Sequence, residues 1–320
     1  MHNVKKLSLR EYYGKTLVEL GRANREIVVL DADLSGSTRT SLFRKEFPDR
    51  FHNMGVSEQD MMGTAAGFAT VGKIPFASTF AIFASGRAWE QIRQSICYPG
   101  LNVKIVATHG GITVGADGPS HHACEDIAVM RAIPNMTVIM PSDAYETSAA
   151  VRAVSECIGP VYIRLSREKF PVIFEESKKF RIGEADVLKK GTDATIISCG
   201  MMTHAALEAA EQLEKEGESV GILNMSTIKP LDKNALLRAA HETGALVTAE
   251  EHSIIGGLGS AVAEITAENE PVPVVRVGVK DTFTMSGDPV DLLEAYGLTS
   301  MDIVEAARKA IALKAHSERV

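Results

Sequence analysis

The sequence has 320 residues, of which 45% are hydrophobic and 23% are charged, and its formal net charge is -7. That length and composition predict a folded protein with about two domains, each able to bury its own core. The acidic balance, without a basic stripe, argues against a nucleic-acid partner. No stretch reaches about 18 consecutive apolar residues and the start carries no signal-peptide pattern, so we expect no membrane span and a cytoplasmic protein.

The four cysteines lie far apart in the sequence and form no CxxC pair; they are Cys97, Cys124, Cys157 and Cys199. Such spacing indicates neither a zinc knuckle nor a disulfide framework. We therefore expect at least three of them to be buried thiols.

Short strand-like runs alternate with helix-length amphipathic stretches over the first half of the chain. Because these runs are almost continuously apolar, they are typical of parallel strands that helices cover on both faces. The alternation predicts an α/β fold with a doubly wound, mainly parallel sheet. The runs are REIVVLDAD, KIPFAS, NVKIVATHG, MTVIMPSD and GPVYIRLS.

A proline-bearing, charge-rich segment, EKFPVIFEESKKFRI, interrupts this alternation, and we interpret it as a linker. Four further strand-like runs follow, DATIISCG, SVGILNMS, GALVTAEEH and VPVVRVGV, with helical stretches between them. The predicted organisation is a first domain over residues 1–168, a linker over 169–183 and a smaller α/β domain over 184–320. The segment EEHSIIGGLGSAVAE predicts a tight turn, because it lacks the third glycine and the acid of a dinucleotide site.

Ligands of open α/β sheets bind beyond the carboxyl ends of the strands, which directs attention to loops of the first domain. The loop LSGSTRT could hold an anion on its backbone amides, or simply begin a helix with Ser37 or Thr38 as N-cap. Glu58 falls in the first turn of a predicted helix, where the helix dipole favours a carboxylate. Phe80 and Phe83 follow a strand three residues apart, so they could face a flat ligand or pack in the core.

The loop Gly115–Asp126, GADGPSHHACED, gathers acids and histidines around a Gly-Pro turn. Its glycines and proline allow the tight turns that would bring Asp117, His121 and His122 toward one point. These residues lack the helical i, i+4 histidine pair of many zinc sites, so we predict no metal site in this chain.

Two arginines end the run VYIRLSR. Arg167 could point its planar guanidinium at a phosphate, whereas for Arg164 we expect a surface salt bridge. The patterns of P-loop nucleotidases, zincins and α/β-hydrolases are absent from the sequence. Residue patterns alone thus predict a polar site on loops of an α/β domain.

At these residues the sequence resembles the C-terminal half of the transketolases, over nearly the whole chain. The longest match, GADGPSHHACEDIAVMRAIPNMTVIMPSD, is similar to the family's DGPTH segment and the strand that follows it. DADLSGS, NMGVSEQDMMGTAAGFA and STFAIF resemble further family motifs, in the family's order. The resemblance implies a pyrimidine-binding domain, a transketolase C-terminal domain, and thiamine diphosphate-dependent transfer of two-carbon ketol units between sugar phosphates.

The resemblance also implies a cofactor site. Glu58 matches the glutamate that hydrogen-bonds the aminopyrimidine ring and so helps the cofactor to form its nucleophilic carbanion. Phe80 and Phe83 would pack on the pyrimidine. One position departs from the family, since a third aromatic that is common in full-length transketolases falls at Gly86.

Residues that would grip the sugar phosphate are implied in the same way, and they are Arg10, Ser37, His109 and Arg167. Asp117 would take a substrate hydroxyl and His121 the ketose end. Together with Glu58, these two are the predicted catalytic residues. The resemblance implies no role for His122 or Cys124.

The sequence contains no GDG segment with a later asparagine, which in full-length transketolases holds Mg²⁺ (or Ca²⁺) and the diphosphate. The resemblance therefore implies that a separate N-terminal subunit supplies that part, and that this chain is the second subunit of a split transketolase. Because the family's cofactor lies between the pyrimidine domain of one chain and the diphosphate domain of another, we expect a two-plus-two heterotetramer.

Three alternatives remain from the sequence. The beta subunit of a 2-oxo acid dehydrogenase has the same two domains, although its loop resembles QHSQ and the loop here reads DGPSHH. Deoxyxylulose-phosphate synthase shares the loop but is a single long chain, so a fragment would be required. A scaffold subunit could keep the fold without catalysis.

Overall fold

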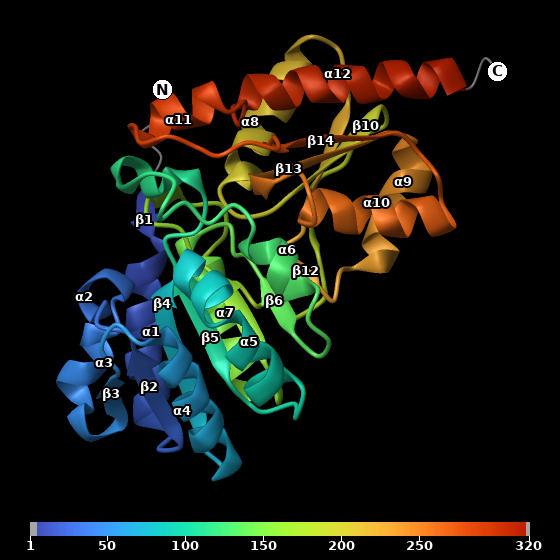
Figure 1. Ribbon diagram of the computed structural model, residues 1–320. Helices are drawn as coiled ribbons and strands as arrows, with labels where there is room; N and C mark the ends of the chain where they lie inside the picture. Colours follow the sequence, from blue (N-terminus) through green and yellow to red (C-terminus); the bar gives the residue numbers. More distant parts are fainter. Residues whose placement is uncertain (1–4, 318–320) are drawn as a thin grey trace.

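A computed structural model describes residues 5–317 of the chain, and it confirms the predicted α/β class. Six strands of the first half and one of the second form a seven-stranded sheet, and five strands of the second half form another, with helices packed on both sheets (Figure 1). Among residues 5–317, no helix has both the length and the apolar character that crossing a membrane requires.

The first sheet has the order β12-β6-β7-β5-β4-β2-β3, and all its neighbours are parallel except β12 and β6. Each of the five strand-like runs predicted for this half contains or overlaps one of its strands. The central strands are buried along their whole length, as expected for a sheet with helices on both faces. The strands are β2 (Ile27–Asp31), β3 (Phe51–Asn53), β4 (Ile74–Phe80), β5 (Lys104–Thr108), β6 (Thr137–Ile139), β7 (Val161–Arg164) and β12 (Thr227–Lys229).

Side-chain caps begin two of the longer helices of this half. Ser8 Oγ accepts a hydrogen bond from the N–H of Glu11 at the start of α1, and Asp143 does the same for Glu146 at the start of α7. The helices are α1 (Leu9–Ala23), α2 (Ser35–Thr38), α3 (Ser41–Glu46), α4 (Glu58–Thr70), α5 (Trp89–Gln91), α6 (Asp126–Arg131) and α7 (Ala144–Glu156). Shorter 3₁₀ or π turns are η1 (Pro48–Arg50), η2 (Phe83–Arg87), η3 (Ile92–Cys97) and η4 (Ile112–Asp117).

The segment predicted as a linker carries a short strand. β8 (Lys169–Pro171) pairs antiparallel with β1 (Lys6–Ser8). Further on, the carboxylate of Asp143 accepts hydrogen bonds from the N–H groups of Ile173 and Phe174, both at 2.8 Å. The start of the segment is therefore attached to the first half of the chain.

The second sheet has the order β14-β13-β10-β11-β9, and only β9 is antiparallel to its neighbour. The predicted tight turn is confirmed, since Gly256 has a φ of +80° between β13 and α10. The strands are β9 (Asp186–Lys189), β10 (Ala194–Ser198), β11 (Val220–Asn224), β13 (Leu246–Ser253) and β14 (Val274–Val279). The helices are α8 (Met202–Lys215), α9 (Lys233–Thr243), α10 (Leu258–Asn269), α11 (Pro289–Ala295) and α12 (Ser300–Ser317).

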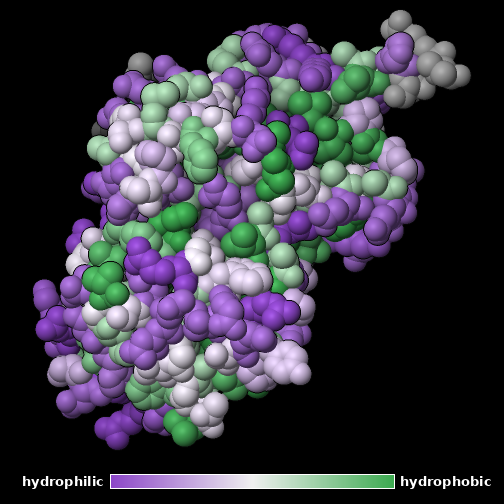
Figure 2. Space-filling view, in the orientation of Figure 1, coloured by the Kyte–Doolittle hydropathy of each residue, from purple (hydrophilic) through white to green (hydrophobic). Residues whose placement is uncertain are grey.

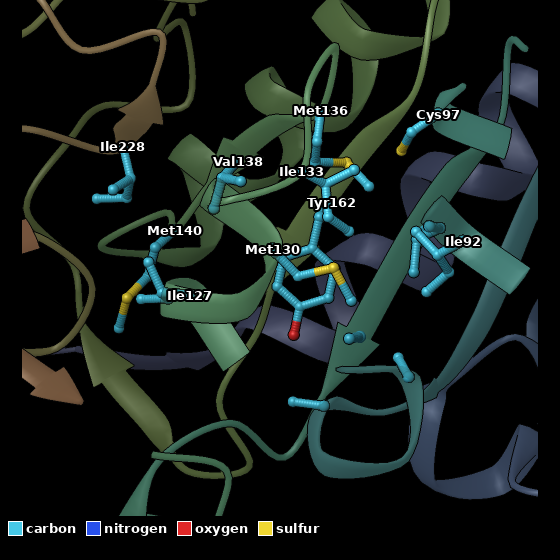
Figure 3. Close-up of a cluster of buried hydrophobic side chains, with 14 of the residues drawn as sticks. Ile92, Cys97, Ile127, Met130, Ile133, Met136, Val138, Met140, Tyr162 and Ile228 are labelled. Carbon is cyan, nitrogen blue, oxygen red and sulfur yellow. The ribbon is translucent and has the colours of Figure 1, made fainter. Parts of the chain in front are cut away.

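One strand joins the two halves of the chain in a way that we did not predict. β12 leaves the second half and pairs antiparallel with β6 of the first, with Thr227 opposite Ile139. Ile228 belongs to the same buried cluster as Val138 and Met140 (Figure 3). The two halves therefore share a hydrophobic core. On the surface, some hydrophobic side chains lie around the middle of the face shown in Figure 2.

Candidate functional site

The predicted site residues lie at the carboxyl-end edge of the first sheet or on the helix beside it. Glu58 opens α4 after β3, Phe80 ends β4, and His109 directly follows β5. Arg167 lies three residues beyond the end of β7. This placement follows from the parallel sheet, which brings the ends of sequentially distant strands to one edge.

Arg10, on the first turn of α1, joins three of the other predicted phosphate-binding residues. Its Nη1 donates to the carbonyl of Ser37 at 2.7 Å and lies 3.5 Å from His109 Nε2, and its Nη2 donates to the carbonyl of Arg167 at 2.8 Å. Its Nε is buried and has no hydrogen-bond partner among residues 5–317. Burial lowers the pKa of Arg10, and neighbouring Arg39 and Arg167 lower it further, but a guanidinium stays charged at neutral pH.

His109 is a neutral member of this cluster. Burial, reinforced by Arg10, Arg167 and His121, lowers its pKa to about 3. Because Arg10 can only donate, Nε2 of the neutral ring accepts and Nδ1–H donates to Thr108 Oγ1 at 2.8 Å. The cluster therefore combines the permanent positive charges of Arg10 and Arg167 with the uncharged ring of His109. Such a cluster is suited to an anion such as a phosphate.

The loop after β2 is fixed by a buried aspartate. Asp31 accepts hydrogen bonds from the N–H of Leu34 at 2.5 Å and from the hydroxyls of Thr38 and Thr40 at 2.7 and 2.8 Å. The alternative in which Ser37 or Thr38 caps a helix is wrong, because α2 begins after Leu34 and has no side-chain cap. Thr38 instead donates to the aspartate that holds the loop in place.

Arg167 also reaches the loop that follows β5. Its Nη1 donates to the carbonyl of Val114 at 2.6 Å and lies 3.3 Å from Asp117 Oδ1. Arg167 and Asp117 are each about 38% exposed at the side chain, so both remain accessible from solvent. The predicted phosphate ligand and the predicted hydroxyl ligand are therefore neighbours.

Glu58 is buried, with an exposed fraction of 1%, and is paired with an arginine that the sequence analysis did not single out. Arg87 Nη1 donates to Glu58 Oε2 at 3.0 Å, and Thr79 Oγ1 lies 3.5 Å from Oε1. The guanidinium of Arg87 also lies over the ring of Phe83, 4.3 Å from its centroid. A planar cation is thus held between an aromatic face and a buried carboxylate.

Four aromatic side chains line this part of the site. Phe80 stacks on His109 with ring centroids 3.8 Å apart, and Phe80 and Phe83 are nearly parallel at 5.9 Å. His121 approaches Phe83 edge-on at 5.4 Å. Phe80 is buried, whereas Phe83 is partly exposed, so Phe83 offers the more accessible ring face.

The two adjacent histidines have different surroundings. His121 is partly exposed, and its Nδ1 lies 2.9 Å from Ser120 Oγ. His122 is buried and bonds both the Gly115 carbonyl and Thr284, a residue of the second half of the chain. Cys124 is buried, and burial raises the pKa of its thiol. The prediction of at least three buried cysteines is confirmed.

The prediction of a surface salt bridge for Arg164 is wrong. Arg164 is 1% exposed and lies 3.4 Å from Asp126, and its Nη2 donates to the carbonyl of Glu251 at 2.8 Å. Burial alone would lower the pKa of Arg164, but the carboxylates of Asp126 and Glu251 raise it overall. Sequence reasoning placed this arginine at the surface because its two acidic neighbours come from distant segments.

Arg87 could have been recognised from its spacing. It follows Phe83 by four residues in FASGRAWE, so one turn brings both to the same side of a helix.

Among residues 5–317, no group of three or more histidine, cysteine or acidic side chains could hold a metal ion.

Comparison with known proteins identifies the class of this two-domain α/β chain. Residues 5–172 match the transketolase pyrimidine-binding domain, and residues 183–303 match the transketolase C-terminal domain. A transketolase C-terminal section from Methanocaldococcus jannaschii is 53% identical over 93% of this chain and 94% of its own length. The chain belongs to the transketolase family.

Two further similarities concern divided enzymes. A 6-deoxy-6-sulfo-D-fructose transketolase subunit from Clostridium sp. is 45% identical over 94% of each chain. A solved structure described as a split-gene transketolase, in an inactive β4 tetramer, is 56% identical. It superposes with a TM-score of 0.90 and covers 97% of this chain and 100% of its own.

Proposed function

We propose that this chain is the pyrimidine-binding subunit of a split, thiamine diphosphate-dependent transketolase. It would transfer a two-carbon ketol unit from a ketose phosphate to an aldose or aldose phosphate, together with a separate subunit that holds the diphosphate and Mg²⁺ or Ca²⁺. The observation that carries the proposal is the buried carboxylate of Glu58, which Arg87 links to the ring of Phe83. The similarity of the whole chain to subunits of divided transketolases supports it.

The residues at Glu58 fit the pyrimidine ring of the cofactor. Arg87 is a flat group that stacks on Phe83 and donates an N–H to Glu58. An aminopyrimidine needs the same two contacts, a ring face and a carboxylate, so Glu58, Phe80 and Phe83 would hold it. When bound, thiamine diphosphate supplies a carbon nucleophile and an electron sink. Glu58 would keep a proton at the pyrimidine nitrogen.

The sugar phosphate would be held by four residues, which are Arg10, Arg167, Ser37 and His109. The two guanidinium groups give charge and directed donors. Among residues 5–317 the buried Nε of Arg10 has no hydrogen-bond partner, which leaves one donor for the phosphate. Asp117, beside Arg167, would accept from a sugar hydroxyl, and His121 would meet the ketose end near Phe83. Arg167 would then bind the sugar phosphate directly and also hold Asp117 in place for the sugar hydroxyl.

The names of two relatives favour anionic sugars as substrates. The relative from Clostridium sp. acts, by its name, on a sulfonated fructose, and a sulfonate is an anion that arginines also bind. We propose phosphorylated ketoses of central carbohydrate metabolism as the first substrates to test. The proposed assembly is a two-plus-two heterotetramer with the diphosphate-binding subunit.

The test is ketol transfer from xylulose 5-phosphate to ribose 5-phosphate with thiamine diphosphate and Mg²⁺. We expect activity when the chain is mixed with the transketolase N-terminal subunit of the same organism, and none with either subunit alone. Activity of this chain alone would contradict the split site. Oxidative decarboxylation of a 2-oxo acid by the mixture, without ketol transfer, would contradict the transketolase reaction.

A further inference from the structure

The loop that carries Asp117 and His121 is held from the second half of the chain. Figure 1 shows α11 and the segment before it lying against this loop, which runs from Gly110 to His122. Near its start, Glu251 Oε1 accepts from the N–H and the hydroxyl of Thr113, both at 2.8 Å. Glu251 is fully buried, so this contact is shielded from water.

Close backbone approach holds the middle of the loop. A side chain at Gly115 would press on Pro289, and one at Gly118 would clash with the hydroxyl of Ser286. Both glycines have positive φ angles, +81° and +77°, which other residues adopt at a cost. The loop backbone therefore lies against residues 286–289 too closely for a side chain at either glycine.

His122 completes the attachment at the end of the loop. Its Nε2 lies 2.9 Å from the carbonyl of Gly115, which can only accept, so Nε2 carries the proton. In the neutral ring Nδ1 is then the acceptor, and Thr284 Oγ1 donates to it at 2.7 Å. Burial lowers the pKa of His122, which favours this neutral form. The imidazole of His122 thus links the end of the loop to Gly115 in its middle, and it also connects the loop to Thr284.

We infer that Thr284, acting through His122, is a positioning residue that sets the place of Asp117 and His121 for the sugar substrate. Thr284 belongs to a segment, residues 280–288, that has no helix or strand and is mostly exposed. Phe283 and Met285 on either side of it are exposed, whereas Thr284 is partly buried against the loop. The C-terminal domain would thereby shape the substrate site. This inference rests on the proposed function for its kinetic consequence.

The first experiment measures the loop itself and needs no catalysis. Hydrogen exchange of residues 110–122 is compared in the isolated chain for wild type, Thr284→Val and Thr282→Val. The control hydroxyl, that of Thr282, is exposed and hydrogen-bonds only to the carbonyl of Phe283 among residues 5–317. We expect faster exchange in the loop for Thr284→Val alone. Equal exchange in all three proteins would overturn the inference.

The second experiment measures substrate binding in the reconstituted complex. Losing one hydrogen bond should raise KM for the ketose phosphate about fivefold in Thr284→Val, with the Kd for thiamine diphosphate unchanged. Thr284→Ser should restore the wild-type KM, and adding Thr284→Val to His122→Phe should raise KM no further. A lower melting temperature with wild-type KM would overturn the inference. A wild-type complex without ketol transfer would count against the proposed function, leaving the exchange result as the test of this inference.

Discussion

Arg87 donates a hydrogen bond to the buried carboxylate of Glu58 at 3.0 Å while its guanidinium lies on the ring of Phe83. The arginine thereby takes the two contacts that we propose for the pyrimidine. Because Glu58 is 1% exposed and Arg87 is about half exposed, moving the arginine into solvent would leave the carboxylate buried and unpaired. Cofactor binding would require Arg87 to move aside or to share the carboxylate.

Replacing Arg87 should destabilise the isolated subunit. Arg87→Met leaves Glu58 buried without its charged partner, which should lower the free energy of unfolding by about 1–2 kcal/mol. Urea denaturation measures the change. Arg93→Met, at an exposed arginine on η3, is the matched control. Equal stability of the two variants would show that the ion pair contributes nothing.

Arg167 should matter most for phosphorylated substrates. Removing its guanidinium in Arg167→Met should raise KM for ribose 5-phosphate by about tenfold or more, because a charge-assisted contact to the phosphate is lost. KM for unphosphorylated ribose should change much less. Steady-state kinetics with both acceptors measure the difference, and Arg181→Met, at an exposed linker arginine, serves as control. A similar rise for both acceptors would argue against phosphate binding at Arg167.

His109 should make folding stability sensitive to acid. Its pKa of about 3 in the folded chain lies below the usual 6.5, so the unfolded chain binds more protons between these values. The contribution of this group to the free energy of unfolding is therefore complete above about pH 6.5 and falls as the pH drops toward 3, by about 3 kcal/mol near pH 4.5.

The measurement is urea denaturation at pH 7 and at about pH 4.5. His109→Gln should lose less stability than wild type over this interval, because glutamine does not titrate. His241→Gln, at an exposed histidine of α9, should lose as much as wild type. An identical loss in His109→Gln and wild type would contradict the buried, neutral state of His109.

The main strands of both sheets could be predicted because their apolar runs are long enough to stand out. β12 could not be, since three residues beginning at Thr227 give no local signal and their partner, β6, lies far away in the sequence. β1 and β8 escaped prediction for the same reason, as each is a three-residue strand stabilised by the other.

The candidate site shows the same limit. Family motifs made Glu58, Phe83 and the loop around Asp117 recognisable, because each motif is a short continuous segment of the sequence. Glu251 and Thr284 were not recognisable, because their importance comes from contacts with other segments. Arg87 offered only its four-residue spacing from Phe83, which does not reveal its contact with Glu58. Arg164 was misplaced at the surface because a single sequence does not show that Asp126 and Glu251 bury it.

The most direct test of the central claim is ketol transfer by a reconstituted complex that carries Glu58→Gln. The amide keeps the shape of the side chain but cannot hold a proton at the pyrimidine as a carboxylate does, so kcat should fall by roughly a hundredfold or more with assembly intact. Asp60→Asn, at an exposed acid in the same helical turn, should keep wild-type activity. Wild-type activity in Glu58→Gln would contradict the proposal that this chain contributes the catalytic carboxylate of a split transketolase.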